Sequence, residues 1–226
     1  MKIAPEGWPF IAGSAVLTVL VFLLTRNASA LVPLLLLVFM VYFFRDPERA
    51  VPQEKNIFVA PADGRVIVVK DVVEPLYLKK SAKMISIFMS PLNVHVNRSP
   101  DAGKVVDVMH KRGNFKAAYS DEAAETNEST SMILSTGRGL IMVRQVAGLI
   151  ARRIVCRSLP GDMLRRGQRY GLIKFSSRVD LFLPEAVQVM VAPGDRVRAG
   201  ETIVARGADQ ESPLQQRRGR SLRNSV

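Results

Sequence analysis

Two long apolar runs open the chain. They span residues 8–24 and 28–44, contain no charged residue, and are separated by a link whose only charge is Arg26. At about 1.5 Å per residue, such a run forms a helix of about 25 Å, the short limit for a hydrocarbon core of about 30 Å. A membrane hairpin, either spanning or re-entrant, is therefore predicted for residues 1–50. A cleaved signal peptide or a buried soluble hairpin is the alternative. Against a signal peptide, Lys2 is the only basic residue before the first run, and a second apolar run follows at once.

After the hairpin, the pattern changes to short β-branched runs broken by glycine, proline and aspartate. Alternation of this kind is typical of strands. It predicts a mainly β domain, a barrel or sandwich, over residues 51–210. The polar stretch 117–127 is expected to form a loop or a short helix. The tail 211–226 holds four arginines and no apolar run, so it is predicted to be disordered, with attraction to a lipid surface as the alternative.

An eight-residue pattern, G-D-x-[LV]-R-x-G-[QE], occurs twice in the second half of the chain, at residues 161–168 and 194–201. We expect its glycines to adopt positive φ in a turn that leads into a strand. Such paired turns resemble the hammerhead turns of lipoyl and biotinyl carrier domains. No Met-Lys carrier dipeptide lies between them, so a related β geometry without a carrier function is predicted.

The chain is strongly basic. Its 226 residues include 32 Lys and Arg against 20 Asp and Glu, a formal net charge of +12, which favours a polyanionic partner such as a nucleic acid or an anionic bilayer. Cys156 is the only cysteine and there are two histidines, so we expect a reducing compartment and no metal. Arg45, Arg49 and Lys55 follow the second apolar run, and this positive bias predicts that the large domain is cytoplasmic.

Four motifs stand in order along the chain: FFRDP at 43–47, APADG at 60–64, MSPLNVHVNR at 89–98 and YGLIKFSSRVD at 170–180. None is a nucleotide or metal motif. Together with the hairpin and the Gly-Asp turns, they resemble the short bacterial form of phosphatidylserine decarboxylase over nearly the whole chain. The resemblance implies a pyruvoyl cofactor made from the chain itself, no metal, no pyridoxal phosphate, and two self-derived chains, α and β, that remain associated.

The resemblance also implies the site residues. The cut bond is Ser176–Ser177, and the pyruvoyl group forms from Ser177 by attack of its hydroxyl on the preceding carbonyl, β-elimination, and hydrolysis to the ketone and ammonia. A hydroxyl is a weak nucleophile unless a base removes its proton. His95, oriented by Asp63, is the expected base, and His110 is the second candidate. Without the resemblance, the alternative interpretation is that Asp63, before Gly64, is a turn-forming residue and that His95 is a structural residue of a strand.

Two further residues flank the predicted nucleophile. Arg178 is expected either to pair with a substrate phosphate or to be a solvated strand residue. Ser176 departs from the family, which normally has glycine at this position. Glycine adopts unusual φ values more easily and leaves the scissile carbonyl open to attack. Either self-cleavage tolerates Ser176 and is slower, or the chain stays uncut as a non-catalytic, membrane-bound lipid-binding homologue or a trapped precursor.

The sequence therefore predicts a membrane-anchored enzyme that converts phosphatidylserine to phosphatidylethanolamine and CO₂. It is expected at the bacterial inner membrane with its catalytic domain on the cytoplasmic side. Its expected partners are phosphatidylserine and anionic membrane lipid, with no nucleic acid. A membrane-tethered nucleic-acid binder is the remaining alternative, but the chain lacks the interleaved aromatic and basic residues of an RNA-binding sheet.

Overall fold

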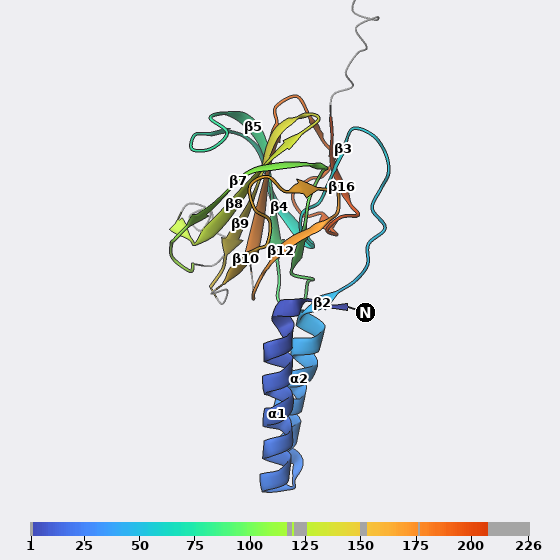
Figure 1. Cartoon of the computed structure of the whole chain (residues 1–226), viewed down its shortest axis with the longest axis vertical. Helices are drawn as coiled ribbons and strands as arrows, with labels where there is room; N and C mark the ends of the chain where they lie inside the picture. Colours follow the sequence, from blue (N-terminus) through green and yellow to red (C-terminus); the bar gives the residue numbers. More distant parts are fainter. Residues whose placement is uncertain (1, 117–118, 120–125, 150–152, 176, 208–226) are drawn as a thin grey trace, which may run out of the picture.

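A computed structural model describes residues 2–116, 119, 126–149, 153–175 and 177–207. A helical hairpin projects as a stalk from a β-rich body (Figure 1). The predicted mainly β fold with an N-terminal helical part is confirmed. Three predictions concern residues outside the described ranges: Ser176, most of the polar stretch 117–127, and the tail 211–226.

The stalk consists of two helices with 3₁₀ turns at their starts: η1 (Pro5–Gly7), α1 (Trp8–Thr25), η2 (Ala28–Ala30) and α2 (Leu31–Phe43). Arg26 ends α1 in a left-handed conformation, φ 48°, and its N–H donates to the Phe22 carbonyl. Among the described residues, one helical stretch, residues 5–25, is long and apolar enough to cross a membrane. Most of its large side chains are exposed, including Leu24. An exposed apolar surface of this kind marks a contact with a membrane or a protein partner.

The body is built on one antiparallel sheet of eight strands. Its order is β11 (Met163–Leu164), β7 (Gly103–Lys111), β8 (Ser129–Thr136), β9 (Gly139–Ala147), β13 (Ser177–Pro184), β5 (Lys80–Met89), β4 (Gly64–Glu74) and β15 (Arg196–Val197). Ile85, Leu181 and Val143 stand side by side in this register and are buried in the main core. Cross-strand apolar pairs of this kind stabilise a sheet and fix its register.

Two smaller antiparallel sheets cover the core. They are β10 (Ile154–Cys156), β12 (Arg169–Ile173) and β6 (Val96–Arg98), and β14 (Gln188–Val189), β16 (Ile203–Arg206) and β3 (Ile57–Val59). Ile173 of β12 and Phe58 of β3 are buried in the same core cluster as Ile85. A two-residue pair, β1 (Lys2–Ile3) and β2 (Arg45–Asp46), joins the two ends of the hairpin.

Both hammerhead turns have the predicted geometry. Gly161 and Gly194 have φ of 100° and 104°, and Gly167 and Gly200 have φ of 73° and 77°. The expectation of positive φ at these glycines is confirmed, and it explains why residues without a Cβ stand there.

Each turn docks on an equivalent strand. The N–H of Gly161 donates to the Val105 carbonyl and that of Gly194 to the Val66 carbonyl, both at 2.8 Å. The sheet therefore has the same arrangement at its two edges, β11 on β7 and β15 on β4. The segments entering β7 and β4 are also alike, SPDAGKV at 99–105 and APADGRV at 60–66. The body thus consists of two halves of related structure.

The end of the stalk is continuous with the body. Phe43 and Phe44 are fully buried and pack with Val94, Val96 and Leu172 of the domain. The predicted division at residue 50 stays a prediction, but these contacts show that the last residues of the hairpin belong to the domain core.

Candidate active site

Ser177 is the first residue of β13, in the middle of the large sheet. It pairs with Met89 of β5 on one side and Ala147 of β9 on the other, and it is completely buried. Its hydroxyl donates to the thioether sulfur of Met89, at 3.4 Å. Because a thioether is a weak acceptor, this hydroxyl is not committed to a strong hydrogen bond and can be turned toward another group.

The backbone just before Ser177 is strained. Phe175 has φ 59°, in the left-handed region that bulky side chains rarely adopt. The conformation costs on the order of 1–3 kcal/mol and persists only where packing enforces it. The ring of Phe175 stacks on Phe43 with centroids 4.5 Å apart and planes 25° from parallel. Contact with the hairpin therefore holds the chain in this conformation next to the predicted cut.

His95 lies just before β6 and is completely buried. Its Nδ1 is 3.0 Å from the Asn93 carbonyl, and its Nε2 has no hydrogen-bond partner among the described residues. Burial lowers the pKa of His95 to about 4. The hydrogen bond to the Asn93 carbonyl opposes this fall, because it favours the protonated form. A carbonyl can only accept, so Nδ1 carries the proton and Nε2 carries a free lone pair. This is the state that a general base requires.

An aromatic cluster made of Phe10, Phe43, Phe44 and Phe175 covers His95. The Phe43 ring lies 4.3 Å from the His95 ring, 4.5 Å from Phe175 and 5.0 Å from Phe44, and Phe44 lies 5.3 Å from Phe10. Three of these phenylalanines come from the hairpin, so the hairpin forms one wall of the site. Sequence reasoning singled out the FFRDP motif but gave Phe43 and Phe44 no role.

Asp63 does not form the predicted hydrogen bond with His95. One oxygen accepts from Arg49 at 2.7 Å and the other from the Ala199 N–H at 2.8 Å. Burial raises the pKa of the Asp63 carboxyl, and the Ala199 and Arg49 contacts oppose that rise. The expectation that a carboxylate orients His95 is corrected: within the described part of the chain, Nδ1 of His95 bonds to the Asn93 carbonyl, and Asp63 bonds to Arg49 and Ala199 instead.

Arg45 links Asp63 and His95 electrostatically. Its positive charge lowers the pKa of His95, after the larger effect of burial, and also acts on Asp63. Its guanidinium donates to the Leu92 carbonyl at 2.8 Å and to the Tyr42 carbonyl at 2.7 Å, and thereby ties the loop before His95 to the end of α2. The FFRDP motif was the sequence signal for this residue, which sequence reasoning otherwise missed.

The second candidate base, His110, lies elsewhere. It stands on β7 with Nδ1 3.1 Å from the Thr130 hydroxyl. Strand β7 is separated from β13 by β8 and β9. Three strand spacings are about 14 Å, so the structure does not bring His110 to Ser177.

Arg178 is not a solvated strand residue. It is among the largest fully buried side chains, and it donates to Asp180 at 2.6 Å and to the Ser86 hydroxyl at 2.8 Å. Its position on a central strand explains this burial. Contact with a substrate phosphate stays a prediction, and these two partners already occupy much of its guanidinium.

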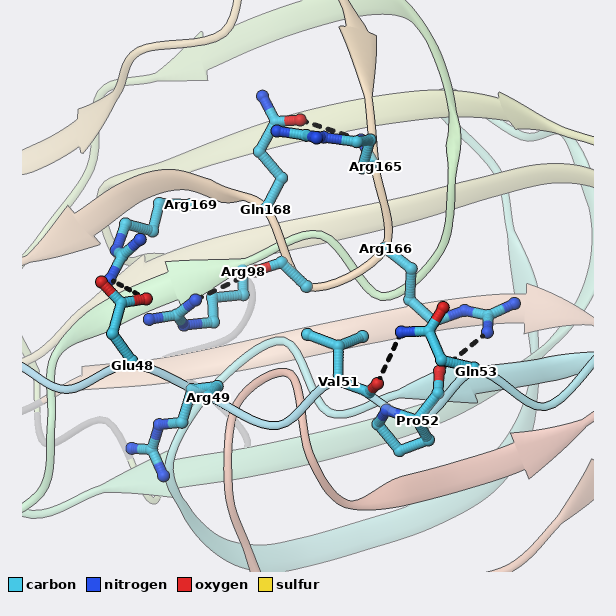
Figure 2. A pocket seen from close by; sticks show the side chains of 11 residues that line it. Glu48, Arg49, Val51, Pro52, Gln53, Arg98, Arg165, Arg166, Gln168 and Arg169 are labelled. Carbon is cyan, nitrogen blue, oxygen red and sulfur yellow. Dashed lines mark hydrogen bonds and ion pairs between the residues drawn. The ribbon is translucent and has the colours of Figure 1, made fainter.

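Two basic cavities lie near these residues. One, of about 650 Å³, is bounded by loop 48–53 and the first hammerhead turn. Three of its arginines bind acceptors that line or adjoin it (Figure 2): Arg98 donates to the Gly167 carbonyl, Arg166 to the Pro52 carbonyl, and Arg169 pairs with Glu48. The other, of about 540 Å³, is lined by Asp63, Gly64, Arg65, Phe88, Ser90, Asn93, Arg196, Val197 and Arg198.

Comparison with known proteins identifies the family of the chain. Residues 36–205 match the family model for phosphatidylserine decarboxylase. Curated relatives named phosphatidylserine decarboxylase proenzyme include those of Citrifermentans bemidjiense, 49% identical over 209 residues and covering 89% of this chain and 95% of that protein, and of Pelobacter propionicus, 50% identical over 213 residues and covering 90% and 96%. That of Symbiobacterium thermophilum is 46% identical over 205 residues, covering 90% and 95%. The chain therefore belongs to the phosphatidylserine decarboxylase family.

Proposed function

We propose that this chain decarboxylates phosphatidylserine to phosphatidylethanolamine and CO₂, using a pyruvoyl group that it makes from Ser177. The observation that carries the proposal is the neutral Nε2 of His95, which has no hydrogen-bond partner among the described residues. The His95 ring contacts Phe43, and Phe43 stacks on Phe175, two residues before Ser177. Membership of the family supports the substrate, because the relatives are named for it.

Self-cleavage begins with proton removal from Ser177. As Nε2 of His95 accepts this proton, Oγ attacks the carbonyl carbon of residue 176. The new C–O bond replaces the C–N bond, and the freed amine takes up a proton. Loss of the Ser177 Cα proton and rupture of the Cβ–Oγ bond then release residue 176 as a carboxylate. Hydrolysis of the remaining enamine gives a ketone and ammonia. A positioned base contributes about 10² to 10⁴ in rate.

The surroundings of Ser177 fit a ketone at this position. The residue is buried at a strand start beside the Met89 thioether, and the aromatic cluster limits access of water. When formed, the pyruvoyl ketone supplies an electrophile that binds the substrate amine and accepts the electrons released with CO₂. His95 can then hold, at Nε2, the proton that the product needs.

The fold supports two further parts of the proposal. Strand β13 pairs with β5 along residues 177–184 and with β9 along residues 177–182, so the two chains produced at 176/177 are held together. The exposed apolar stalk supports attachment to a bilayer. We place the protein at the inner membrane with its body on the cytoplasmic side, where phosphatidylserine and other anionic lipids are its partners.

A second candidate function rests on one sequence feature. Ser176 stands where the family motif has glycine. If its side chain prevents the acyl shift, the chain is an uncut lipid-binding homologue that uses the same hairpin and basic surface.

Release of CO₂ from carboxyl-labelled phosphatidylserine in mixed micelles tests the proposal. The full chain should release label, and Ser177→Ala should release none and stay uncut. Ser176→Ala is the matched control, because it removes the neighbouring hydroxyl and keeps the nucleophile. A full chain that binds phosphatidylserine without cutting itself or releasing label favours the binding homologue and contradicts the enzyme.

A further inference from the structure

Two arginines face each other across an edge of the large sheet. Arg65 of β4 is the register partner of Arg196 of β15. Both side chains are exposed, and in the described part of the chain neither has a hydrogen-bond or ion-pair partner. Both line the cavity of about 540 Å³, together with Arg198. Like charges directly opposite one another destabilise a strand pair, so the empty arrangement is unfavourable by itself.

The other half of the body shows that the fold does not require this pair. The equivalent position to Arg65 is Lys104, and its register partner on β11 is Met163. The turn and its docking hydrogen bonds are the same in both halves. Two facing cations are therefore a feature of one half only, and a ligand is a better explanation for them than the geometry of the turn.

The cavity adjoins the reacting centre, because Asp63 and Asn93 line it, but its arginines lie on the other face of the sheet from Ser177. Arg65, Phe88 and Arg178 form one register row across β4, β5 and β13, next to the row that pairs Met89 with Ser177. Two strand spacings are about 10 Å. Because side chains alternate along a strand, Arg65 lies on the opposite face of the sheet from Ser177.

The cavity is also at the stalk end of the body. Ser90 and Asn93 line it, and Arg45 of the hairpin junction ties the intervening Leu92 to α2. Asp63 is the acidic residue of the lining, and both of its oxygens already accept hydrogen bonds from Arg49 and Ala199. In the other basic cavity, Arg98, Arg166 and Arg169 are paired with carboxylates, and Arg165 is exposed. Three of its arginines therefore offer less free charge than Arg65 and Arg196.

We propose that Arg65 and Arg196 form a clamp for the headgroup phosphate of a phospholipid in the bilayer that holds the stalk. Guanidinium groups bind phosphate oxygens through paired, charge-assisted hydrogen bonds. A bound phosphodiester relieves the repulsion between the two arginines and gives the body a second attachment to the membrane. The clamp goes beyond the proposed reaction and does not require the chain to be cut.

Titration calorimetry of the full chain in a neutral detergent tests the clamp. The probe is water-soluble dihexanoyl-phosphatidylserine, and dihexanoyl-phosphatidylglycerol serves as a phosphodiester lipid without an amine. Arg65→Gln/Arg196→Gln should weaken binding of both lipids about tenfold or more, about 1.4 kcal/mol per tenfold. Lys104→Gln/Arg165→Gln removes the same charge from the other half and should change binding less than about twofold. Equal loss in the two double variants would overturn the proposal.

Inorganic phosphate separates the possible sources of the ligand. At the same concentration as the lipid, inorganic phosphate should not displace it. The lipid assignment would be overturned if Arg65→Gln/Arg196→Gln weakened binding of inorganic phosphate but not binding of the lipid. The unliganded double variant should melt at or above the parent temperature, since repulsion is removed; earlier melting would assign the pair a structural role instead. Ser177→Ala should bind the amine-free phosphatidylglycerol like the parent, so the test of the clamp stays valid even if the proposed reaction is wrong.

Discussion

The base proposed for Ser177 is prepared by burial and by one backbone carbonyl. Burial keeps the His95 ring neutral, and the Asn93 carbonyl fixes the tautomer with the lone pair on Nε2. Arg45 acts on both His95 and Asp63, and Asp63 also pairs with Arg49. We therefore propose that Asn93 orients the base and that Asp63 influences its pKa through Arg45.

Replacing Asp63 tests this division. In Asp63→Asn the charge of Arg45 is no longer balanced by the Asp63 carboxylate, so the pKa of His95 falls further and proton removal slows. We expect uncut 25 kDa chain to accumulate on a denaturing gel, with a rate loss of about 10². Glu201→Gln is the matched control, since Glu201 also pairs with Arg49, at 3.3 Å, and should cut normally. Normal cutting by Asp63→Asn would leave Asp63 as a turn residue.

The lowered pKa of His95 gives a pH dependence. Self-cleavage should be constant from pH 8 to about 5.5 and fall with a midpoint near 4, because Nε2 loses its lone pair only there. An unfolded histidine titrates near 6.5. Between these values the unfolded chain binds a proton that the folded chain does not, so acid lowers the free energy of unfolding. NMR titration of the His95 ring with rate measurements checks this, and a midpoint near 6.5 would contradict the buried neutral base.

The motifs led to Ser177 and His95 as candidate site residues, and their roles stay predictions; the motifs did not indicate what surrounds these two residues. The positive φ of Phe175 and the partner of His95 depend on packing between segments far apart in sequence. Arg178 was expected to meet solvent or phosphate because it is charged. Its strand is central in the sheet, and that position buries even an arginine beside its partner Asp180.

At the scale of elements, β13 is expected to hold the two fragments together after self-cleavage. The predicted cut lies immediately before this strand, whose pairing with β5 and β9 does not involve the bond that breaks. The two fragments should therefore elute together in native size-exclusion chromatography and separate only in denaturant. A C-terminal fragment that elutes alone without denaturant would contradict this arrangement.

The end of α2 is predicted to control self-cleavage. Phe43→Ala removes the ring that contacts both His95 and Phe175, and it should cost about 3–5 kcal/mol of stability. With the aromatic wall gone, Phe175 can relax and the precursor should be cut more slowly in a gel time course. Phe39→Ala is the control, since Phe39 is only partly buried, 6.0 Å from Phe43. If Phe43→Ala is cut at the same rate as the parent, the end of α2 does not control self-cleavage and this prediction is wrong.

The periodicity of the chain predicted the hairpin and the strands, because apolar runs and alternation are local properties. It did not show where the hairpin ends and the body begins. Phe43 and Phe44 continue the apolar run without a break, and only the fold shows that they pack against Val94 and Leu172. An apolar residue has the same pattern whether it faces lipid or protein.

At the scale of the whole molecule, the body has two halves that share the docked turn and its entering segment but differ in sequence at a few positions. The repeated turns were visible in the sequence, but the repeat of the entering segments, 60–66 and 99–105, became clear only when both were found docked on equivalent turns. Asp63 and Arg65 belong to one half, and Ala102 and Lys104 stand at the equivalent positions of the other. Residues proposed for chemistry and for lipid contact are thus found where the two halves differ.

Intact-mass spectrometry of the purified full chain tests the central claim most directly. Self-cleavage predicts two polypeptides, residues 1–176 and 177–226, with the second lighter by one ammonia than its encoded sequence because Ser177 has become a pyruvoyl group. Ser177→Ala, purified in the same way, should give one species of 25 kDa. A single unmodified species from the parent chain, or a cut at any other bond, would contradict the account.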